Sequence, residues 1–506
     1  MTTVVPKGWT TSSVGDVFEI LDSLRKPINA DDRATRRGDV PYYGATGQAG
    51  WIDEFLFDEE LILLGEDGAP FLDSNKPKAY VIRGKSWVNN HAHILRAPSS
   101  TPSSFWKHQL DIVAYKPFVS GTTRLKLPQG RMKQIPVLVP PCREQRRLAE
   151  ALDSYLSRLD NAVSSLERVQ AKLKAYRASV LKAAVEGRLV PTEASLARAA
   201  KLAYEPAEAL LARMRKERRR RWEEAELGKL KAAKKAPKDD RWKAKCREPL
   251  ALDTSKLPEL PEGWVYTRIE PLIEVHEGMK TGPFGSLLKK HEHGKSGVPV
   301  LGIENIEPMR FVRGSKIHVT SEKARQLAAY AIAADDLLIS RSGTVGEVCV
   351  VPNDIGEARF STNVMRVRFL IGAPLPAFFS VLLNGSPFVR HQIRDQCKGT
   401  TRDFLNQRIL SSLVFPLPPL EEQARMLTAV DEKLSVAGVL SEVCNISRIR
   451  TTRLRQSILK WAFEGKLVDQ DPTDEPATKL LARIRAERAA VSPVRKTLGR
   501  RVREAA

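Results

Sequence analysis

The sequence predicts a mixed α+β protein in which one architecture, a globular unit followed by a long helix, occurs twice. The prediction rests on a fixed internal repeat, on two stretches with heptad-spaced apolar residues, and on short β-branched runs between them. At 506 residues, the chain also exceeds what one ordinary core holds. We therefore predict a pseudo-two-fold protein whose two globular units are joined by two long helices forming an antiparallel coiled coil.

The repeat consists of short identical motifs at a constant separation. Gly-Thr-Thr-Arg occurs at 121–124 and 399–402, and Pro-Pro-x-x-Glu-Gln at 140–145 and 418–423, both 278 positions apart. Leu-Lys-x-Ala-x-Glu-Gly-x-Leu-Val at 181–190 returns at 459–468 with the same separation. Both halves also open alike, with Pro-x-Gly-Trp ending at Trp9 and at Trp264. Because the sequences between these motifs differ, one repeated frame presents two different surfaces.

Each predicted helix follows a Pro-Pro pair and ends near a glycine that suits a C-terminal cap, Gly187 or Gly465. Apolar residues recur at alternating steps of four and three, as in a coiled-coil seam. An amphipathic helix on its own domain would show the same period, but helices of about 40 residues, roughly 60 Å, favour pairing with each other. The predicted seam is Leu148, Leu152, Tyr155, Leu159, Ala162, Leu166, Val169, Leu173, Tyr176, Val180 and Ala183 with Met426, Val430, Lys433, Ala437, Leu440, Cys444, Ser447, Thr451, Leu454, Ile458 and Trp461, the second copy being polar in its middle.

The globular units contain short β-branched runs bounded by Gly, Pro or Asn, which predict the strands of a twisted sheet. These runs lie at 61–64, 78–82, 298–303, 337–339, 348–351 and 364–369. We expect helices at 103–116 and 376–395.

The charge of the chain indicates its type of partner. The formal net charge is +22, which favours nucleic acid, with solubility or an acidic protein partner as alternatives. Five scattered cysteines without a C-x-x-C pair indicate reduced thiols. The sequence has neither an apolar run long enough to span a bilayer nor a basic and apolar leader, so we expect a cytoplasmic protein without a membrane partner.

Loops between the predicted strands contain the candidate DNA contacts. Glycines and small hydroxyls let the backbone approach phosphate, and Arg or Asn can contact base edges bidentately. An ordinary turn is the alternative for each loop, although the repeated Gly-Thr-Thr-Arg favours a function. The candidates are Tyr43, Thr46, Asn89, Asn90, His91, Thr122, Thr123 and Arg124 in the first unit, and Lys280, Thr281, Lys289, Lys290, Arg341, Ser342, Thr344, Asn363, Thr400, Thr401 and Arg402 in the second.

The catalytic motifs that we searched for are incomplete. Gly294-Lys295-Ser296 lacks the first glycine of a phosphate-binding loop, because Lys289 occupies its position. The histidine pairs at 91 and 93 and at 291 and 293 lack zinc-finger ligands nearby, so we interpret them as loop histidines. Glu464-Gly465-Lys466 is part of the repeated frame. We therefore expect no catalytic residue, metal or cofactor in this chain.

The motifs resemble those of specificity subunits of Type I restriction-modification systems. The resemblance is carried by LPEGW at 260–264, DLLISRSGTVG at 336–346, PLPPLEEQ at 416–423 and the repeated frame, and it covers nearly the whole chain. It implies two target recognition domains that bind the halves of an asymmetric split DNA site, separated by an antiparallel helical spacer. It also implies two modification subunits that methylate adenine with S-adenosylmethionine, and motor-nuclease restriction subunits; both activities belong to the partners.

The resulting domain prediction assigns target recognition domains to 1–141 and 261–419, spacer helices to 142–190 and 420–468, a basic helical linker to 191–260 and a helical tail to 469–506. Residues 213–247 hold sixteen Lys or Arg against six Asp or Glu. This segment is a solvated face or a contact for DNA phosphates or an acidic partner. A stand-alone enzyme with fused recognition domains, or a coiled-coil protein unrelated to DNA, is the competing interpretation; the first would need a cofactor motif that we do not find.

Overall fold

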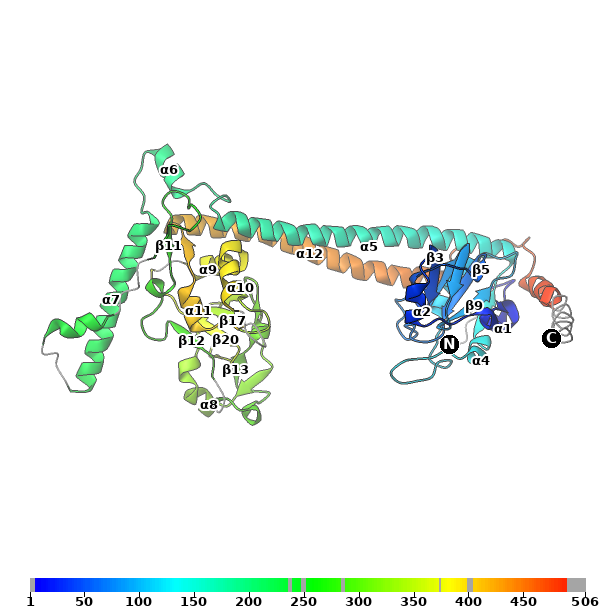
Figure 1. Ribbon diagram of the computed structural model, residues 1–506, viewed down its shortest axis with the longest axis horizontal. Helices are drawn as coiled ribbons and strands as arrows, with labels where there is room; N and C mark the ends of the chain where they lie inside the picture. Colours follow the sequence, from blue (N-terminus) through cyan, green and yellow to red (C-terminus); the bar gives the residue numbers. More distant parts are fainter. Residues whose placement is uncertain are drawn as a thin grey trace. The chain divides into compact units, whose positions relative to one another are not determined.

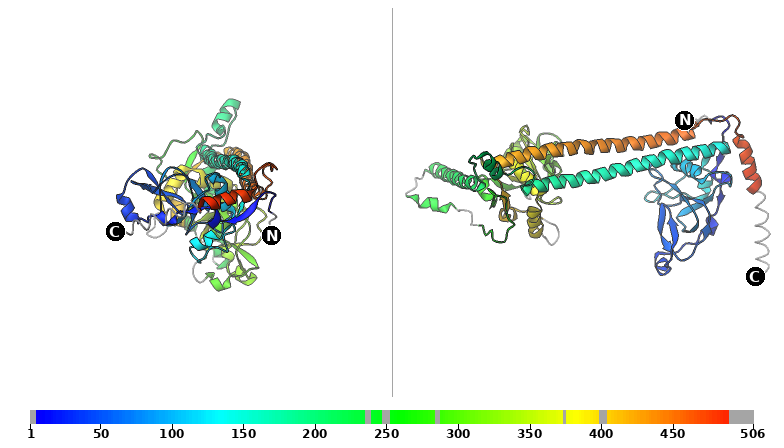
Figure 2. Two further views of the ribbon diagram at one scale, coloured as in Figure 1. Left: turned by 90° about the vertical axis from the view of Figure 1, so that its right-hand side faces the viewer. Right: turned by 90° about the horizontal axis from the view of Figure 1, so that it is seen from above.

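The computed structural model describes residues 5–234, 239–246, 252–283, 287–372, 375–397 and 404–488 (Figures 1 and 2). Its contacts divide the chain into two compact units. Unit 1 comprises Met1–Val169 and Val443–Ala506, and unit 2 comprises Gln170–Glu442. The last part of the chain therefore completes the unit that the first part begins.

Unit 1 is built on two four-stranded sheets, ordered β2-β9-β6-β7 and β4-β3-β8-β5, and on a short strand pair, β1 with β10. Strand β6 is buried along its whole length because it lies between β9 and β7, with helix α3 packed on the sheet. The elements are β1 (Thr10–Ser13), α1 (Val14–Val17), β2 (Glu19–Ile20), η1 (Asp22–Leu24), α2 (Ala30–Thr35), β3 (Val40–Gly44), β4 (Gly47–Ile52), β5 (Phe57–Asp58), β6 (Leu61–Gly65), β7 (Ala79–Ile82), β8 (Lys85–Val88), β9 (Ala92–Arg96), α3 (Ser103–Ile112), α4 (Gln129–Lys133) and β10 (Pro136–Val139).

Unit 2 has sheets ordered β12-β20-β17-β18 and β16-β13-β19, a small hairpin of β14 and β15, and a short strand pair, β11 with β21. Its elements are α6 (Glu193–Ala200), α7 (Ala207–Ala232), η2 (Asp240–Lys245), β11 (Val265–Thr267), η3 (Glu270–Leu272), β12 (Met279–Thr281), η5 (Lys290–Glu292), β13 (Val298–Leu301), η6 (Ile303–Asn305), β14 (Ile306–Glu307), β15 (Arg310–Phe311), β16 (Ile317–Val319), α8 (Ser321–Gln326), η7 (Ala328–Tyr330), β17 (Leu337–Ser340), β18 (Val348–Val350), β19 (Arg359–Phe360), β20 (Val364–Val367), α9 (Pro376–Gly385), α10 (Pro387–Gln396), α11 (Gln407–Ser412) and β21 (Phe415–Leu417).

The two units share one topology although their sequences differ. Strand β6 lies between β9 and β7 with both pairs antiparallel, and β17 lies in the same way between β20 and β18. In the second sheet β3 runs parallel to β8, and β13 runs parallel to β19. The chain therefore has the predicted mixed fold, and this fold occurs twice, once in each unit.

Two helical predictions need correction in detail. The helix expected at 376–395 is two helices, because Ser386 caps the second through the backbone N–H of Val389 and Pro387 starts it. The helix expected at 103–116 already ends at Ile112, where α3 terminates. The predicted strand at 298–303 ends at Leu301, and a short 3-10 turn follows it.

The long helices are α5 (Cys142–Val185) and α12 (Leu420–Phe463), each of 44 residues (Figures 1 and 2). Both end as predicted, since Gly187 and Gly465 have a left-handed φ of 67°. The first part of α5 packs in the core of unit 1 with the last part of α12, and the last part of α5 packs in the core of unit 2 with the first part of α12.

The predicted seam is buried only in part. Leu148, Leu152 and Val180 of α5 and Met426, Val430, Ala437, Cys444 and Ile458 of α12 are buried. Other predicted seam residues are exposed, namely Tyr155, Val169, Tyr176, Leu440, Leu454 and Trp461. Within unit 1, Arg455 forms an ion pair with Asp160. Within unit 2, a Cβ on Gly438 would lie 3.8 Å from the guanidinium of Arg177. From the first of these pairs to the second, the position rises by 17 along α5, from Asp160 to Arg177, and falls by 17 along α12, from Arg455 to Gly438.

The repeated motifs form the junctions of the frame. In unit 2, the buried Glu422 accepts a hydrogen bond from the indole of Trp264 (2.9 Å) and another from the backbone N–H of Glu193 (2.8 Å). The amide of Gln423 donates to the carbonyl of Pro418, and that of Gln145 donates to Pro140 in unit 1, both at 2.9 Å. The Pro-Pro-x-x-Glu-Gln motif therefore closes the helix start onto the preceding strand.

The Pro-x-Gly-Trp motif of each half contacts the segment that follows the long helix of the other half. Gly263 accepts a hydrogen bond from the N–H of Ala207, after α5 (2.9 Å), and Gly8 accepts one from Ala477, after α12 (3.0 Å). A Cβ on Gly187 would lie 2.7 Å from Pro261, and one on Gly465 would lie 2.8 Å from Pro6. Each half thus begins by packing on the end of the other half's helix, which explains why these motifs occur twice.

Helix α7 contains the first part of the basic segment 213–247. Its first turns pack against unit 2, and the residues that follow are mostly charged. Helix α7 buries Leu210, Leu211 and Met214 in unit 2, and several of the arginines that follow form ion pairs. Trp222 of α7 stacks on Trp242, with ring centres 5.9 Å apart. Among the described residues, no helix is long and apolar enough to cross a membrane.

Candidate nucleic-acid interface

Four loops of unit 1 meet at one edge of its sheets. The N–H of Asn89 donates to the carbonyl of Tyr43 (3.1 Å), the N–H of Glu66 donates to His91 (2.8 Å), and the N–H of Leu127 donates back to Glu66 (2.7 Å). These bonds join the β3–β4 turn, the segment after β6, the β8–β9 turn and the loop that ends at residue 127. The structure therefore brings together all the candidate segments that the sequence analysis named in this unit.

The Gly-Thr-Thr-Arg loop is the tip of a hairpin-like turn. Ser120 and Lys126 exchange backbone hydrogen bonds of 2.9 and 2.8 Å. Gly121 has a φ of 102°, and a Cβ there would lie 2.5 Å from the carbonyl oxygen of Arg124, so the turn requires glycine. Residues 122–124 are exposed. The tip thus offers two hydroxyls and a guanidinium to solvent on a fixed backbone.

Asp67 links two of the predicted contact residues. Its carboxylate lies 2.7 Å from Nδ1 of His91 and 3.1 Å from the guanidinium of Arg124. Asp67 is not among the contact residues predicted from the sequence. A carboxylate beside an arginine and a histidine can orient both and can accept from the amino group of cytosine.

A buried ionic network lies beneath these loops. His93 is fully buried in β9, with Nδ1 2.6 Å from Asp22 and Nε2 2.8 Å from the carbonyl of Leu127. Arg25 reaches both Asp22 (3.6 Å) and Glu66 (2.6 Å). Burial opposes ionisation of Asp22, but hydrogen bonds from His93, Ile94 and Gln129 hold its pKa below the ordinary value.

This network corrects our interpretation of His93, which lies in a strand and not in a loop. Asp22, Glu66 and His93 lie close enough together to hold a metal ion. The guanidinium of Arg25 already faces both carboxylates, so the group is compensated without one. We therefore assign the network to holding the loop that ends at Leu127.

Unit 2 has the same backbone connections. The N–H of Arg341 donates to the carbonyl of Asn363 (2.9 Å), as that of Glu66 does to His91, and the N–H of Leu405 donates to Arg341 (3.0 Å), as that of Leu127 does to Glu66. Gly343 has a φ of 80° where the first unit has Gly68 at 70°. Arg341 therefore occupies the position of Glu66, and Asn363 that of His91.

The prediction that Arg341 contacts DNA is not supported, because the residue is only 2% exposed. Its guanidinium donates to the carbonyls of Leu405 and Thr362, both at 3.1 Å, and lies 4.2 Å from the ring centre of Phe404. Burial lowers the pKa of Arg341 from its ordinary value. Asn89 is also buried, and its side chain accepts from the N–H of His91 (2.8 Å). Both residues position loops.

The other candidates differ in exposure. Thr46, Asn90, Thr344 and Asn363 are exposed, whereas Tyr43, His91, Lys280, Thr281 and Ser342 are partly buried. Lys280 lies 3.5 Å from the carboxylate of Glu277, and Thr281 is followed by Gly282, whose N–H donates to Val364. Lys289 and Lys290 are exposed. They lie close in sequence to Glu292, which forms an ion pair with Lys323 of α8. Thr400, Thr401 and Arg402 lie outside the described residues.

Sequence reasoning missed Glu66, Asp67 and Arg25. A signal was present, since Gly-Glu-Asp-Gly at 65–68 follows a predicted strand as Ser-Arg-Ser-Gly at 340–343 follows its counterpart. Aligning the strands instead of the motifs would have found these positions.

Two loop-bearing units of one topology on a repeated helical frame define a duplicated recognition protein. The model of the Type I restriction modification DNA specificity domain matches residues 6–171 and again 261–435. The chain therefore belongs to the family of type I restriction-modification specificity subunits, which are DNA-recognition and not catalytic subunits.

Curated relatives have the same assignment. The specificity subunit of the type I restriction enzyme EcoDI of Escherichia coli is 23% identical over 495 residues, which is 96% of each chain. That of EcoBI, also of Escherichia coli, is 25% identical over 70% of this chain and 64% of the relative. A putative specificity subunit of Haemophilus influenzae, S.HindORF215P, is 31% identical over 28% of this chain and 35% of the relative. The chain thus spans less than two thirds of these last two relatives.

A solved structure supports the fold. A chain from a study of complex assembly and conformational transition of the type I R-M system superimposes with a TM-score of 0.56 at 14% identity, and the match covers 92% of this chain and all of that one. At this identity the likeness shows the fold alone.

Proposed function

We propose that this chain is the sequence-specific DNA-binding subunit of a type I restriction-modification complex, working on DNA in the cytoplasm, and that each unit recognises one half of an asymmetric bipartite target. The observation that carries the proposal is the backbone arrangement of the loops, which is the same in both units, combined with different side chains. Where one unit has Glu66 and His91, the other has Arg341 and Asn363. One fixed scaffold with two sets of side chains is suited to two different half-sites.

The DNA contacts that we propose are the exposed and half-exposed loop residues. Arg124 and the hydroxyls of Thr122 and Thr123 are exposed at the tip of a loop, beyond the backbone pair of Ser120 and Lys126. Arg341 and Asn89 are left out because they hold the loops. The proposed contacts are Tyr43, Thr46, Asn90, His91, Thr122, Thr123 and Arg124, with Lys280, Thr281, Lys289, Lys290, Ser342, Thr344 and Asn363, and, on the repeat alone, Thr400, Thr401 and Arg402.

The partners that we propose are two modification subunits and the restriction subunits, which supply methylation and cleavage. The frame has two similar junctions, one around Glu422 and one around Glu144. Burial raises the pKa of both carboxyls above the ordinary value, as expected for side chains that are enclosed within the folded junctions.

Methylation mapping of host DNA tests the proposal. Single-molecule sequencing should reveal one methylated motif made of two unlike half-sites with an unspecified spacer, and deletion of this chain should abolish it. Purified complex should bind that motif with an affinity that falls steeply as salt increases. A palindromic or continuous motif that depends on this chain would contradict the proposal.

The spacer role of α5 and α12 has its own test. We propose that they pair antiparallel and set the distance between half-sites, supported by the contacts of Arg455 with Asp160 and of Arg177 with Gly438. One heptad inserted at matched positions in each helix adds about 10 Å. At roughly 3.4 Å per base pair, we expect a spacer about three base pairs longer with the half-sites unchanged, although the altered groove phase weakens binding. Selection from a library with randomised spacers measures it; an unchanged spacing in a folded variant would exclude the ruler.

A further inference from the structure

One acidic side chain, that of Asp67, stands among the proposed DNA contacts of unit 1. Asp67 follows Glu66 in the segment after β6, and its side chain is 20% exposed. The contacts predicted around it have hydroxyl, amide, imidazole or guanidinium groups, and none of them is acidic. A carboxylate is repelled by DNA phosphates. Asp67 is therefore suited to something other than the DNA backbone.

The backbone is fixed on both sides of Asp67. The N–H of Leu127 donates to the carbonyl of Glu66 (2.7 Å), and the N–H of Gly68 donates to the carbonyl of Leu125 (3.1 Å). Gly68 has a left-handed φ of 70°, which turns the chain directly after Asp67. Because both neighbours are held, the carboxylate is presented at a set place.

One oxygen of the carboxylate takes both ionic partners of Asp67. Oδ1 lies 2.7 Å from Nδ1 of His91 and accepts a hydrogen bond from the guanidinium of Arg124 (3.1 Å). Among the residues that the structure describes, Oδ2 has no hydrogen-bond partner. The side chain of Arg124 is itself 62% exposed. Asp67 and Arg124 together therefore offer solvent one open acceptor beside a donor.

An acceptor beside a donor matches one kind of base pair. In the major groove, cytosine presents only its N4 amino donor, and the guanine paired with it presents the acceptors O6 and N7. Adenine has the acceptor N7 beside its amino group, which repels a carboxylate, and neither thymine nor guanine offers a donor there. Asp67 fits the cytosine and Arg124 fits the guanine of a C·G pair.

The equivalent position in unit 2 has a different chemistry. Ser342 follows Arg341, whose backbone is bonded as that of Glu66 is, and it precedes a left-handed glycine, Gly343, with a φ of 80°. A serine hydroxyl can both donate and accept, so it can contact several bases. The two units therefore differ at this position between an acceptor alone and a group that does both.

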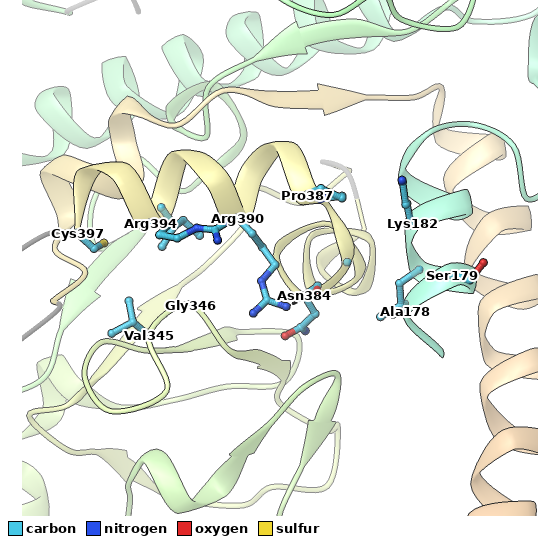
Figure 3. A pocket seen from close by; sticks show the side chains of 13 residues that line it. Ala178, Ser179, Lys182, Val345, Gly346, Asn384, Pro387, Arg390, Arg394 and Cys397 are labelled. Carbon is cyan, nitrogen blue, oxygen red and sulfur yellow. Dashed lines mark hydrogen bonds between the residues drawn. The ribbon is translucent and has the colours of Figure 1, made fainter. Parts of the chain in front are cut away.

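The loop that holds Ser342 is fixed as well. The N–H of Gly346 donates to the carbonyl of Ser340 (3.0 Å). A Cβ on Gly346 would lie 3.4 Å from Ile393 of α10, and Val345 and Gly346 line a hollow of about 800 Å³ beside that helix (Figure 3). Both positions thus stand on held backbone, and what differs between them is the side chain.

We propose that Asp67 is a specificity-determining residue of unit 1, which accepts a hydrogen bond through Oδ2 from the N4 amino group of a cytosine, while Arg124 donates to the paired guanine. Ser342 imposes no such requirement on the other half-site. The inference rests on the proposed function, because it takes these loops as DNA contacts. It deepens that function by naming a base pair and the two side chains that recognise it.

The experiment measures base preference with the complex of this chain and its modification subunits. Methylation mapping first establishes the wild-type motif. Duplexes with each of the four base pairs at every specified position then compete for binding. We expect one C·G pair in one half-site to be favoured by roughly tenfold to a hundredfold over the other pairs.

Asp67→Asn keeps the shape of the side chain and replaces one oxygen by a donor. It should lose the preference for C·G at that position and admit adenine, because an asparagine amide pairs with N6 and N7 of adenine. Arg124→Ala should relax the same position, and the other half-site should stay unchanged in both variants. Asp31→Asn, exposed on α2, is the matched control and should keep every preference. Thermal midpoints check that the variants fold.

The outcomes separate the two proposals. A folded Asp67→Asn variant with wild-type preference at every position would overturn the role of Asp67 and leave the bipartite target intact. Equal weakening on all duplexes, with every preference kept, would show that Asp67 only orients Arg124 and would also overturn it. So would a wild-type bipartite motif without a specified C·G pair. A palindromic or continuous wild-type motif would overturn the proposed function itself.

Discussion

The loops that hold the candidate DNA contacts have the same backbone bonds in unit 1 and unit 2 and opposite charges at their centre. Glu66 in unit 1 is held by Arg25, and its structural counterpart Arg341 in unit 2 is held by backbone carbonyls. The residues bonded to them differ too, since His91 corresponds to Asn363. Loop position and loop chemistry are therefore separable: backbone hydrogen bonds fix where a side chain lies, and its identity is free to change.

The largest expected effect is that of Arg341→Ala in unit 2. The change leaves the carbonyls of Leu405 and Thr362 without a donor in a buried place, so we expect a loss of about 3 kcal/mol in the local stability of these loops. Hydrogen exchange should rise in peptides covering 341–363 and stay unchanged in unit 1. The exposed Arg325→Ala is the control. Unchanged exchange in both would show that the guanidinium does not hold the loops.

A second prediction concerns the buried network around Asp22 and His93 in unit 1. Asp22→Asn removes a carboxylate that accepts three hydrogen bonds, so we expect a loss of about 2 kcal/mol at pH 7. The pKa of Asp22 is lowered in the folded protein, so its contribution is complete above the unfolded value near 3.8 and is lost as the pH falls through the folded value. Thermal midpoints of wild type and variant should therefore converge at acidic pH. A constant difference from pH 7 to pH 3, with Asp31→Asn as control, would argue against this role.

The smallest predicted effect is that of Arg124→Ala, which removes an exposed guanidinium that Asp67 already neutralises in part. We expect about tenfold weaker DNA binding, roughly 1.4 kcal/mol. A base contact would relax specificity at one position of one half-site, and a phosphate contact would weaken all sequences alike. Arg402→Ala, in the repeated motif of the second half, is the matched variant for the other half-site. Wild-type affinity in both folded variants would show that the Gly-Thr-Thr-Arg loop is structural only.

The sequence predicted the repeated helices and their junctions better than it predicted the arrangement of the loops that hold the candidate DNA contacts. Motifs such as those around Gly187 and Gly465 are recognisable because the chain from the Gly-Thr-Thr-Arg motif to the helix end has the same length in both halves, and each glycine packs on the Pro-x-Gly-Trp motif of the other half. The loop positions that precede the Gly-Thr-Thr-Arg motif do not keep this separation. The N–H of Ser361 donates to Leu301 as that of Asn89 donates to Tyr43, so Tyr43 corresponds to Leu301, 258 positions later, and Glu66 corresponds to Arg341, 275 positions later. Loops of unequal length shift the register between units, so a fixed offset could not reveal the pairing. The burial of Arg341 depends on long-range carbonyl partners that no local pattern specifies.

The crosswise junctions also set the order in which the protein can fold during synthesis. Unit 2 is one continuous segment, Gln170–Glu442, so its core is complete once that segment has left the ribosome. Unit 1 must wait, because Gly8 is bound by Ala477 and the core around Trp9 includes Leu480 and Ile484. The part of the chain made first is therefore the part that is finished last.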